Sequence, residues 1–147
     1  MGVYVPLCIK RGERAARTSA LVSSGYEAEE PELHVPLALA KRLSLSLEAL
    51  RGERYRVVGA DTLAYVLGQV EVKLVLEDRE APWLTARAVS VPGEHEVLIS
   101  DALAEALGIE IVAPRSGLWR LSGDPPQEER AAGVLAGLAP GSAARRA

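Results

Sequence analysis

Residues 19–27 read Ser-Ala-Leu-Val-Ser-Ser-Gly-Tyr-Glu, an apolar run that ends in a Ser-Ser-Gly turn. This stretch predicts a buried strand followed by a tight turn. Residues 90–109 read Ser-Val-Pro-Gly-Glu-His-Glu-Val-Leu-Ile-Ser-Asp-Ala-Leu-Ala-Glu-Ala-Leu-Gly-Ile. Within them, a short buried strand at residues 97–99 leads into a helix that Ser100 caps and Gly108 ends.

Most of the other segments also predict strands. Residues 3–10 and 15–23 are rich in β-forming residues on either side of a polar break at Gly12, which predicts a hairpin. Pro36 opens a short helix that runs to Leu43. Further strands are expected at residues 55–59, 63–67, 70–76, 83–91, 109–112 and 118–121, and the capped helix at residues 101–107. Many short strands with two short helices indicate a mainly β domain, closed or sandwiched.

The composition changes after Gly123, and this change divides the chain into a β domain of residues 1–123 and a tail of residues 124–147. The tail is rich in Ala, Gly, Pro and Arg. Asp124 is able to cap a helix over residues 125–139, which would have to dock because it carries few large apolar residues. Disorder is the alternative for the last residues.

Composition and charge exclude several classes of protein. The chain has 147 residues, a net charge of −3 and one cysteine, Cys8, so there is no internal disulfide framework and a reducing, cytoplasmic location is expected. No run of 18 apolar residues predicts a membrane span, and residues 3–9 lack the basic segment of a signal peptide. Interspersed charges and few aromatic residues argue against a nucleic-acid partner.

Over residues 3–122, the order and spacing of these parts resemble the retropepsin-like aspartic proteases, single-domain relatives of half a pepsin. In that family an Ala-Leu-Val strand leads into Asp-Thr-Gly or Asp-Ser-Gly, and a flap hairpin follows. A late Leu-Ile-Gly strand then enters a helix that ends near Leu-Gly. The resemblance implies a small closed β barrel that forms a symmetric homodimer, because a single-domain member holds only half a site.

The resemblance also assigns positions to the site. It places the turn of Ser23, Ser24 and Gly25 at the dimer axis, facing the same turn of a second copy. The tip of the flap falls on a predicted hairpin turn, and Tyr26 and Glu27 join it in lining a groove. The residues of that flap tip are Gly59, Ala60, Asp61 and Thr62.

The chain departs from the family at the chemical centre. The catalytic aspartate falls on Ser23, and none of the four aspartates of the chain lies there. An aspartic protease needs two carboxylates that share one proton, whereas a serine hydroxyl does not ionise near neutral pH. Ser100 stands where glycine is expected, and Asp101 stands where many viral members carry an arginine that pairs with an acid, here Glu27. We therefore expect the ordinary aspartic-protease mechanism to be absent.

Other chemistries stay open at this point. Ser23 or Ser24 as a nucleophile needs a base, and His34 and His95 are the only histidines. Replacement carboxylates are available from Glu27, Glu29 or Asp61, although a run of acids such as residues 27–32 usually forms a solvated loop. No metal or cofactor is expected, because Cys8 and the two histidines lack ligand spacing.

The sequence thus leads to one main interpretation and two alternatives. The main one is a non-catalytic homodimer that accepts an extended peptide beneath its flaps by strand addition. The first alternative is an active peptidase or hydrolase that uses the displaced carboxylates or the two serines. The second is a domain whose groove is vestigial and whose dimer or tail surfaces carry the function.

Overall fold

The computed structural model describes residues 2–23, 25–45, 52–57, 60–125 and 128–131, and for residues 52–57 and 60–63 it describes the backbone only. Its elements follow the chain in this order: β1 (Val3–Arg11), β2 (Arg14–Val22), β3 (Glu32–His34), α1 (Leu37–Arg42), β4 (Gly52–Val57), β5 (Ala60–Leu74), β6 (Leu84–Ser90), β7 (Val97–Ile99), α2 (Asp101–Leu107), β8 (Ile109–Ala113) and β9 (Leu118–Leu121).

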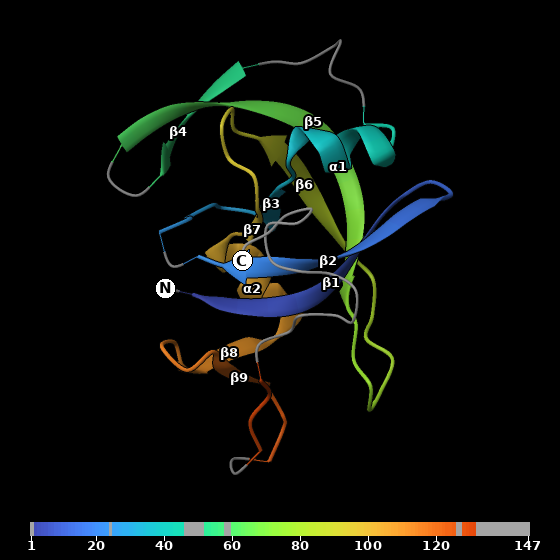
Figure 1. Ribbon diagram of the computed structural model, residues 1–147, viewed down its shortest axis with the longest axis vertical. Coiled ribbons are helices and arrows are strands. Elements are labelled where there is room, and N and C mark those ends of the chain that lie inside the picture. Colours follow the sequence, from blue (N-terminus) through green and yellow to red (C-terminus); the bar gives the residue numbers. More distant parts are fainter. Residues whose placement is uncertain (1, 24, 46–51, 58–59, 126–127, 132–147) are drawn as a thin grey trace.

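Six strands close into a barrel, in the order β1-β2-β7-β3-β6-β5 (Figure 1). The ring closes because β5 pairs back to β1, with Leu74 opposite Leu7. β2 pairs with β7 in parallel and β3 pairs with β6 in parallel, whereas the other pairings are antiparallel. β4 pairs only with β5 among the described strands, and β8 and β9 form a separate hairpin below the ring in Figure 1. The predicted mainly β, closed barrel is confirmed at this level.

Alternation along each strand fills the inside of the barrel. In β1, the side chains of Val3, Val5, Leu7 and Ile9 are fully buried because every second residue points inward. Leu33, Ile99 and Leu103 join them from β3, β7 and α2. The inward face is therefore one continuous apolar core. Cys8, which points the other way in β1, is also covered and is 8% exposed.

One long strand, β5, replaces two strands that the sequence predicted. The separation into residues 63–67 and 70–76 is wrong, because β5 runs through both. The pairing with β6 slips between Val66 and Gly68, and Gly68 has a φ of +110°, which glycine adopts without strain. The alternation of apolar residues breaks at this bulge, and the sequence pattern therefore suggested a turn there.

The hairpin that was predicted as the flap is present as β4 and β5. Val57 lies opposite Ala60, so the chain reverses between these two residues, and Ala60, Asp61 and Thr62 belong to the strand. The prediction of a turn over residues 59–62 is therefore wrong for residues 60–62. Gly59 itself lies outside the described residues.

Residues 128–131 are not helical, and Arg130 and Ala131 pack against β9. The backbone of Arg130 forms a bridge with that of Trp119, and Trp119 Nε1 donates to the Ala131 carbonyl at 2.8 Å. The predicted helix over residues 125–139 is therefore wrong for residues 128–131, and its other positions, apart from Pro125, lie outside the described residues. Asp124 does not cap a helix in the described structure, and its carboxylate binds Leu121 and Arg130 instead.

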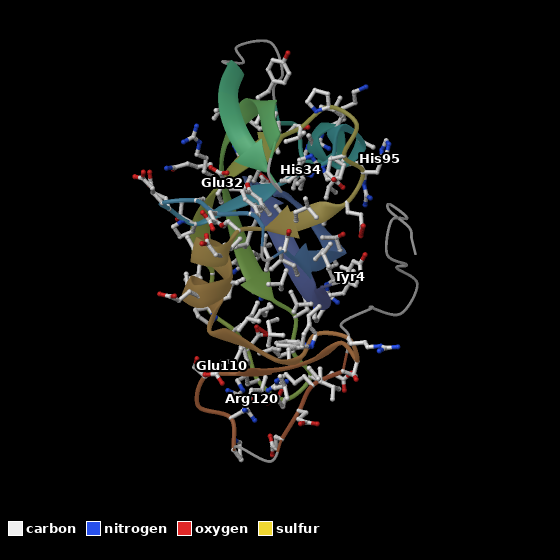
Figure 2. All side chains as sticks on the ribbon, turned by 90° about the vertical axis from the view of Figure 1, so that its left-hand side faces the viewer. Tyr4, Glu32, His34, His95, Glu110 and Arg120 are labelled. Carbon is white, nitrogen blue, oxygen red and sulfur yellow. The ribbon has the colours of Figure 1, made fainter. Side chains whose placement is uncertain are left out.

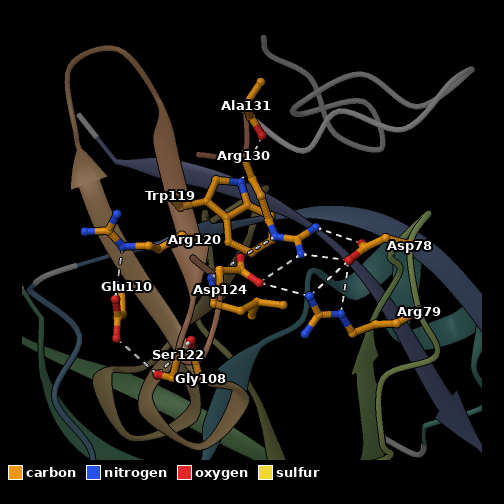
Figure 3. Close-up of polar contacts among 11 residues, drawn as sticks. Asp78, Arg79, Gly108, Glu110, Trp119, Arg120, Ser122, Asp124, Arg130 and Ala131 are labelled. Carbon is orange, nitrogen blue, oxygen red and sulfur yellow. Dashed lines mark hydrogen bonds and ion pairs between the residues drawn. The ribbon is translucent and has the colours of Figure 1, made fainter. Parts of the chain in front are cut away.

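Asp124 is the centre of a charged cluster that ties this segment to the loop before β6 (Figure 3). Its side chain is 1% exposed and accepts hydrogen bonds from the Leu121 N–H at 2.9 Å, from Arg130 Nε at 3.0 Å and from Arg79 Nη2 at 2.9 Å. Arg130 also pairs with Asp78, at 3.0 Å. The hydrogen bonds from Arg130 and Leu121 hold the pKa of Asp124 below its usual range. The carboxylates stay charged, and Asp124, Arg130 and Ala131 pack as part of the domain.

Candidate functional site

The Ser23 turn begins where β2 ends. The Tyr26 N–H donates to the Ser23 carbonyl at 3.2 Å, which closes a four-residue turn. Ser23 and Gly25 are half-buried, and Ser24 lies outside the described residues. Val22 pairs with Ile99, so the end of β7 lies beside the turn. The two stretches that the sequence singled out are therefore neighbours in space.

The N-terminus of α2 holds the chain that follows the turn. The Asp101 N–H donates to the Tyr26 carbonyl at 2.9 Å, and the Asp101 carboxylate accepts from the Ala28 N–H at 3.0 Å. Ser100 Oγ accepts from Leu103 N–H at 3.1 Å, as the predicted helix cap, and also from Glu32 N–H at 3.2 Å. Asp101 thus binds backbone atoms of the loop, and it replaces the pair between an arginine and an acid that many viral retropepsins have at this position.

A buried polar pair lies beneath this loop. Tyr26 is 5% exposed, and its hydroxyl donates to Glu32 Oε2 at 2.7 Å. Arg87 Nε lies 3.9 Å from Glu32 Oε1. Tyr26, which the sequence placed in a groove, therefore braces the loop and has little surface to offer a ligand. Glu32, which the sequence placed in a solvated acidic loop, opens β3 and is 4% exposed. The extended apolar run that follows Glu32 was the only signal for its burial.

Of the candidate replacement groups, the described side chains of Glu27 and Glu29 form no hydrogen bond with Ser23. Glu27 and Glu29 are exposed, and Asp61 lies on β5 with its side chain outside the description. Among the described residues, Ser23 Oγ forms no hydrogen bond with a carboxylate or a histidine, and no group of three His, Cys, Asp or Glu side chains is placed to hold a metal ion. The described atoms thus contain neither an assembled nucleophile with its base nor a carboxylate pair within one chain.

The two histidines have different surroundings. His34 is 2% exposed, its Nδ1 lies 2.7 Å from the Glu96 carbonyl, and its Nε2 has no hydrogen-bond partner among the described residues. Nδ1 therefore carries the proton that this contact needs. Burial is the main cause that lowers the pKa of His34. His95 is exposed on the loop before β7, to the right of His34 in Figure 2.

The burial of His34 predicts a pH dependence of stability. Because the folded pKa lies below the unfolded value of 6.5, the unfolded chain takes up a proton first as the pH falls. The free energy of unfolding should therefore decrease below about pH 6.5, by at most about 1.4 kcal/mol per pH unit for one proton. Urea unfolding between pH 5 and 7 measures this slope. His34→Gln should flatten it and His95→Gln should not. An unchanged slope in His34→Gln would assign the titration to other groups.

A second prediction concerns the double role of Ser100. Ser100→Ala removes the cap of α2 and the acceptor of the Glu32 N–H, in a position that is fully buried. We expect a loss of about 2 kcal/mol in the free energy of unfolding. Chemical denaturation measures it, and Ser122→Ala, an exposed serine, should change stability by less than about 0.5 kcal/mol. Equal losses in the two variants would contradict this role.

No family model matches the chain, and no curated protein matches it. The described part of the chain contains no helix that is long and apolar enough to cross a membrane. The geometry therefore defines the class of fold, a closed six-stranded β barrel with a serine turn held by α2.

Proposed function

We propose that this chain is a non-catalytic retropepsin-like domain that pairs with a second copy of itself and binds an extended peptide. The observation that carries the proposal is the juxtaposition of the Ser23 turn with β7 and the N-terminus of α2. The strand, the turn, the β4–β5 hairpin, the late strand and the helix follow in the order that the resemblance implies. Serine stands at the one position where catalysis would need an acid.

The peptide would add to the β4–β5 hairpin. β4 pairs with β5 along one edge, and its other edge has no partner among the described strands. A free strand edge offers N–H and C=O groups that an extended peptide is able to match.

The absence of catalysis is tested by incubating the pure protein with unfolded casein between pH 3 and 7. We expect no cleavage that pepstatin inhibits. Cleavage that pepstatin does inhibit would overturn the non-catalytic assignment. Nothing in the described geometry favours the displaced-carboxylate alternative, because Glu27 and Glu29 are exposed and are not hydrogen-bonded to Ser23.

Peptide binding is tested by hydrogen exchange with a peptic digest of casein as the probe. Slower exchange of the backbone amides in residues 52–57 is the expected result, because strand addition protects the N–H groups of the free edge of β4. Protection elsewhere, or none, would contradict binding at the hairpin.

The dimer would use a second exposed edge. β8 pairs only with β9 among the described strands. Ile111 on β8 is 42% exposed, one of two exposed large apolar side chains in the part of the chain that the structure describes. We expect the wild-type chain to sediment as a dimer and the Ile111→Lys variant to sediment as a monomer. The far-ultraviolet circular dichroism spectrum of the variant should equal that of the wild type. Val112→Lys, one residue along the same strand, is the matched control. Weak interfaces form at concentrations on the order of 100 µM, so a wild-type chain that is monomeric at about this concentration would contradict the dimer.

A further inference from the structure

A hollow outside the Ser23 turn is lined by three separate parts of the chain. It lies between β2, α1 and the loop that precedes β7, and its volume is about 310 Å³. This volume is at the lower end of the range typical of small-molecule sites. His95, which lies in that loop, is beside α1 in Figure 2.

The lining of the hollow is mainly apolar. Leu39 and Val97 are buried in it, Pro36 and Val91 are half-buried, and Leu37 is 47% exposed. An exposed leucine beside a hollow keeps apolar surface in contact with water, and a ligand with an apolar body would remove that surface from water.

The same hollow is lined by more basic than acidic side chains. Arg17 from β2 and Arg42 from α1 both line it and are exposed, and neither forms an ion pair with a described residue. Glu94 is the one acidic side chain among the lining residues, and its carboxylate already accepts from the N–H groups of His95 and Glu96, each at 3.1 Å. The two guanidinium groups therefore lack an ion-pair partner among the described residues, and a ligand anion would supply one.

We propose that this hollow binds a small organic acid that has a carboxylate and an unbranched apolar chain. Arg17 and Arg42 bind the carboxylate, since a guanidinium presents paired N–H donors that match two carboxylate oxygens. The apolar lining takes the chain. The site is independent of the Ser23 turn and of the peptide edge, so it adds a second ligand to the function proposed above.

Octanoate is the probe for this site, and isothermal titration calorimetry on the full chain measures its affinity. We expect saturable binding that weakens with added salt, because the arginines are exposed. Octanol shares the apolar chain and acetate shares the carboxylate, and both should bind at least about tenfold more weakly. No saturable binding of octanoate, or equal binding of octanol, would overturn the proposal.

Two variants locate the binding. Arg17→Gln combined with Arg42→Gln should weaken octanoate about tenfold, while Arg14→Gln combined with Arg115→Gln removes the same charge from exposed positions elsewhere and should not. Ala38→Trp fills the hollow from an exposed position on α1 and should abolish binding with an unchanged far-ultraviolet spectrum. Undiminished binding in either the arginine pair or Ala38→Trp would place the ligand elsewhere and overturn the proposal.

Discussion

Ser23→Asp is expected to convert this chain into an acid-dependent peptidase. In the dimer that the resemblance to retropepsin-like proteases implies, with the two Ser23 turns facing each other, one substitution supplies two carboxylates at the two-fold axis, where like charges close together force them to share a proton. A general acid or base contributes about 10²–10⁴-fold to a rate, so the gain over the wild-type chain should be at least about 10²-fold. Cleavage of unfolded casein at pH 3–6, with and without pepstatin, measures it.

The substitution should be tolerated by the fold. Ser23 is half-buried, and the turn is closed by its backbone carbonyl, so the side chain is not needed to hold the loop. Asparagine has the same size as aspartate and does not ionise, so Ser23→Asn is the matched control. If Ser23→Asp folds, dimerises and cleaves no faster than Ser23→Asn, then Ser23 does not occupy the position of a catalytic acid.

Trp119→Ala should produce the largest loss of stability among the substitutions considered. Trp119 is 2% exposed, its indole N–H donates to the Ala131 carbonyl, and the Arg130 guanidinium lies 5.7 Å from the ring centroid. Truncating a buried tryptophan costs about 3–5 kcal/mol. Urea unfolding measures the loss. In the variant, limited proteolysis should cut first around Arg130 and Ala131, because Trp119 no longer holds these residues in place.

Trp83 provides the comparison. Its ring is half-buried on the outside of the barrel, with the Lys10 and Lys73 ammonium groups 4.3 and 4.8 Å from its centroid. Contacts of this kind are worth about 1 kcal/mol at exposed sites, so Trp83→Ala should be much milder. Equal destabilisation by the two variants would mean that residues 124–131 contribute little to the domain.

Local chemistry accounts for the elements that the sequence predicted well. α2 begins at Asp101 and ends at Leu107, because the Ser100 hydroxyl caps it and Gly108 adopts a φ of +80°. The β1–β2 hairpin turns at Gly12, which has a φ of +61°. Each of these features depends on residues within a few positions of one another, so the sequence pattern is sufficient to show them.

The sequence predicted only part of the candidate site. The turn at Ser23 and the cap at Ser100 were recognised from their residues, but the bond from Tyr26 to Glu32 was not. Glu32 belongs to a run of acids that the sequence treats as solvated, and only its pairing in β3, between β6 and β7, places it inside. Burial of this kind depends on which strands become neighbours, and neighbours are set by pairings across the whole chain.

Residue types and short spacings were sufficient to predict a mainly β chain and its capped helix. The tertiary structure decided that β5 closes the ring onto β1, that β5 continues through a bulge at Gly68, and that the segment around Arg130 packs on Trp119. Each of these is a long-range pairing whose energy comes from buried side chains and strand hydrogen bonds between distant segments, and no local pattern specifies such a pairing.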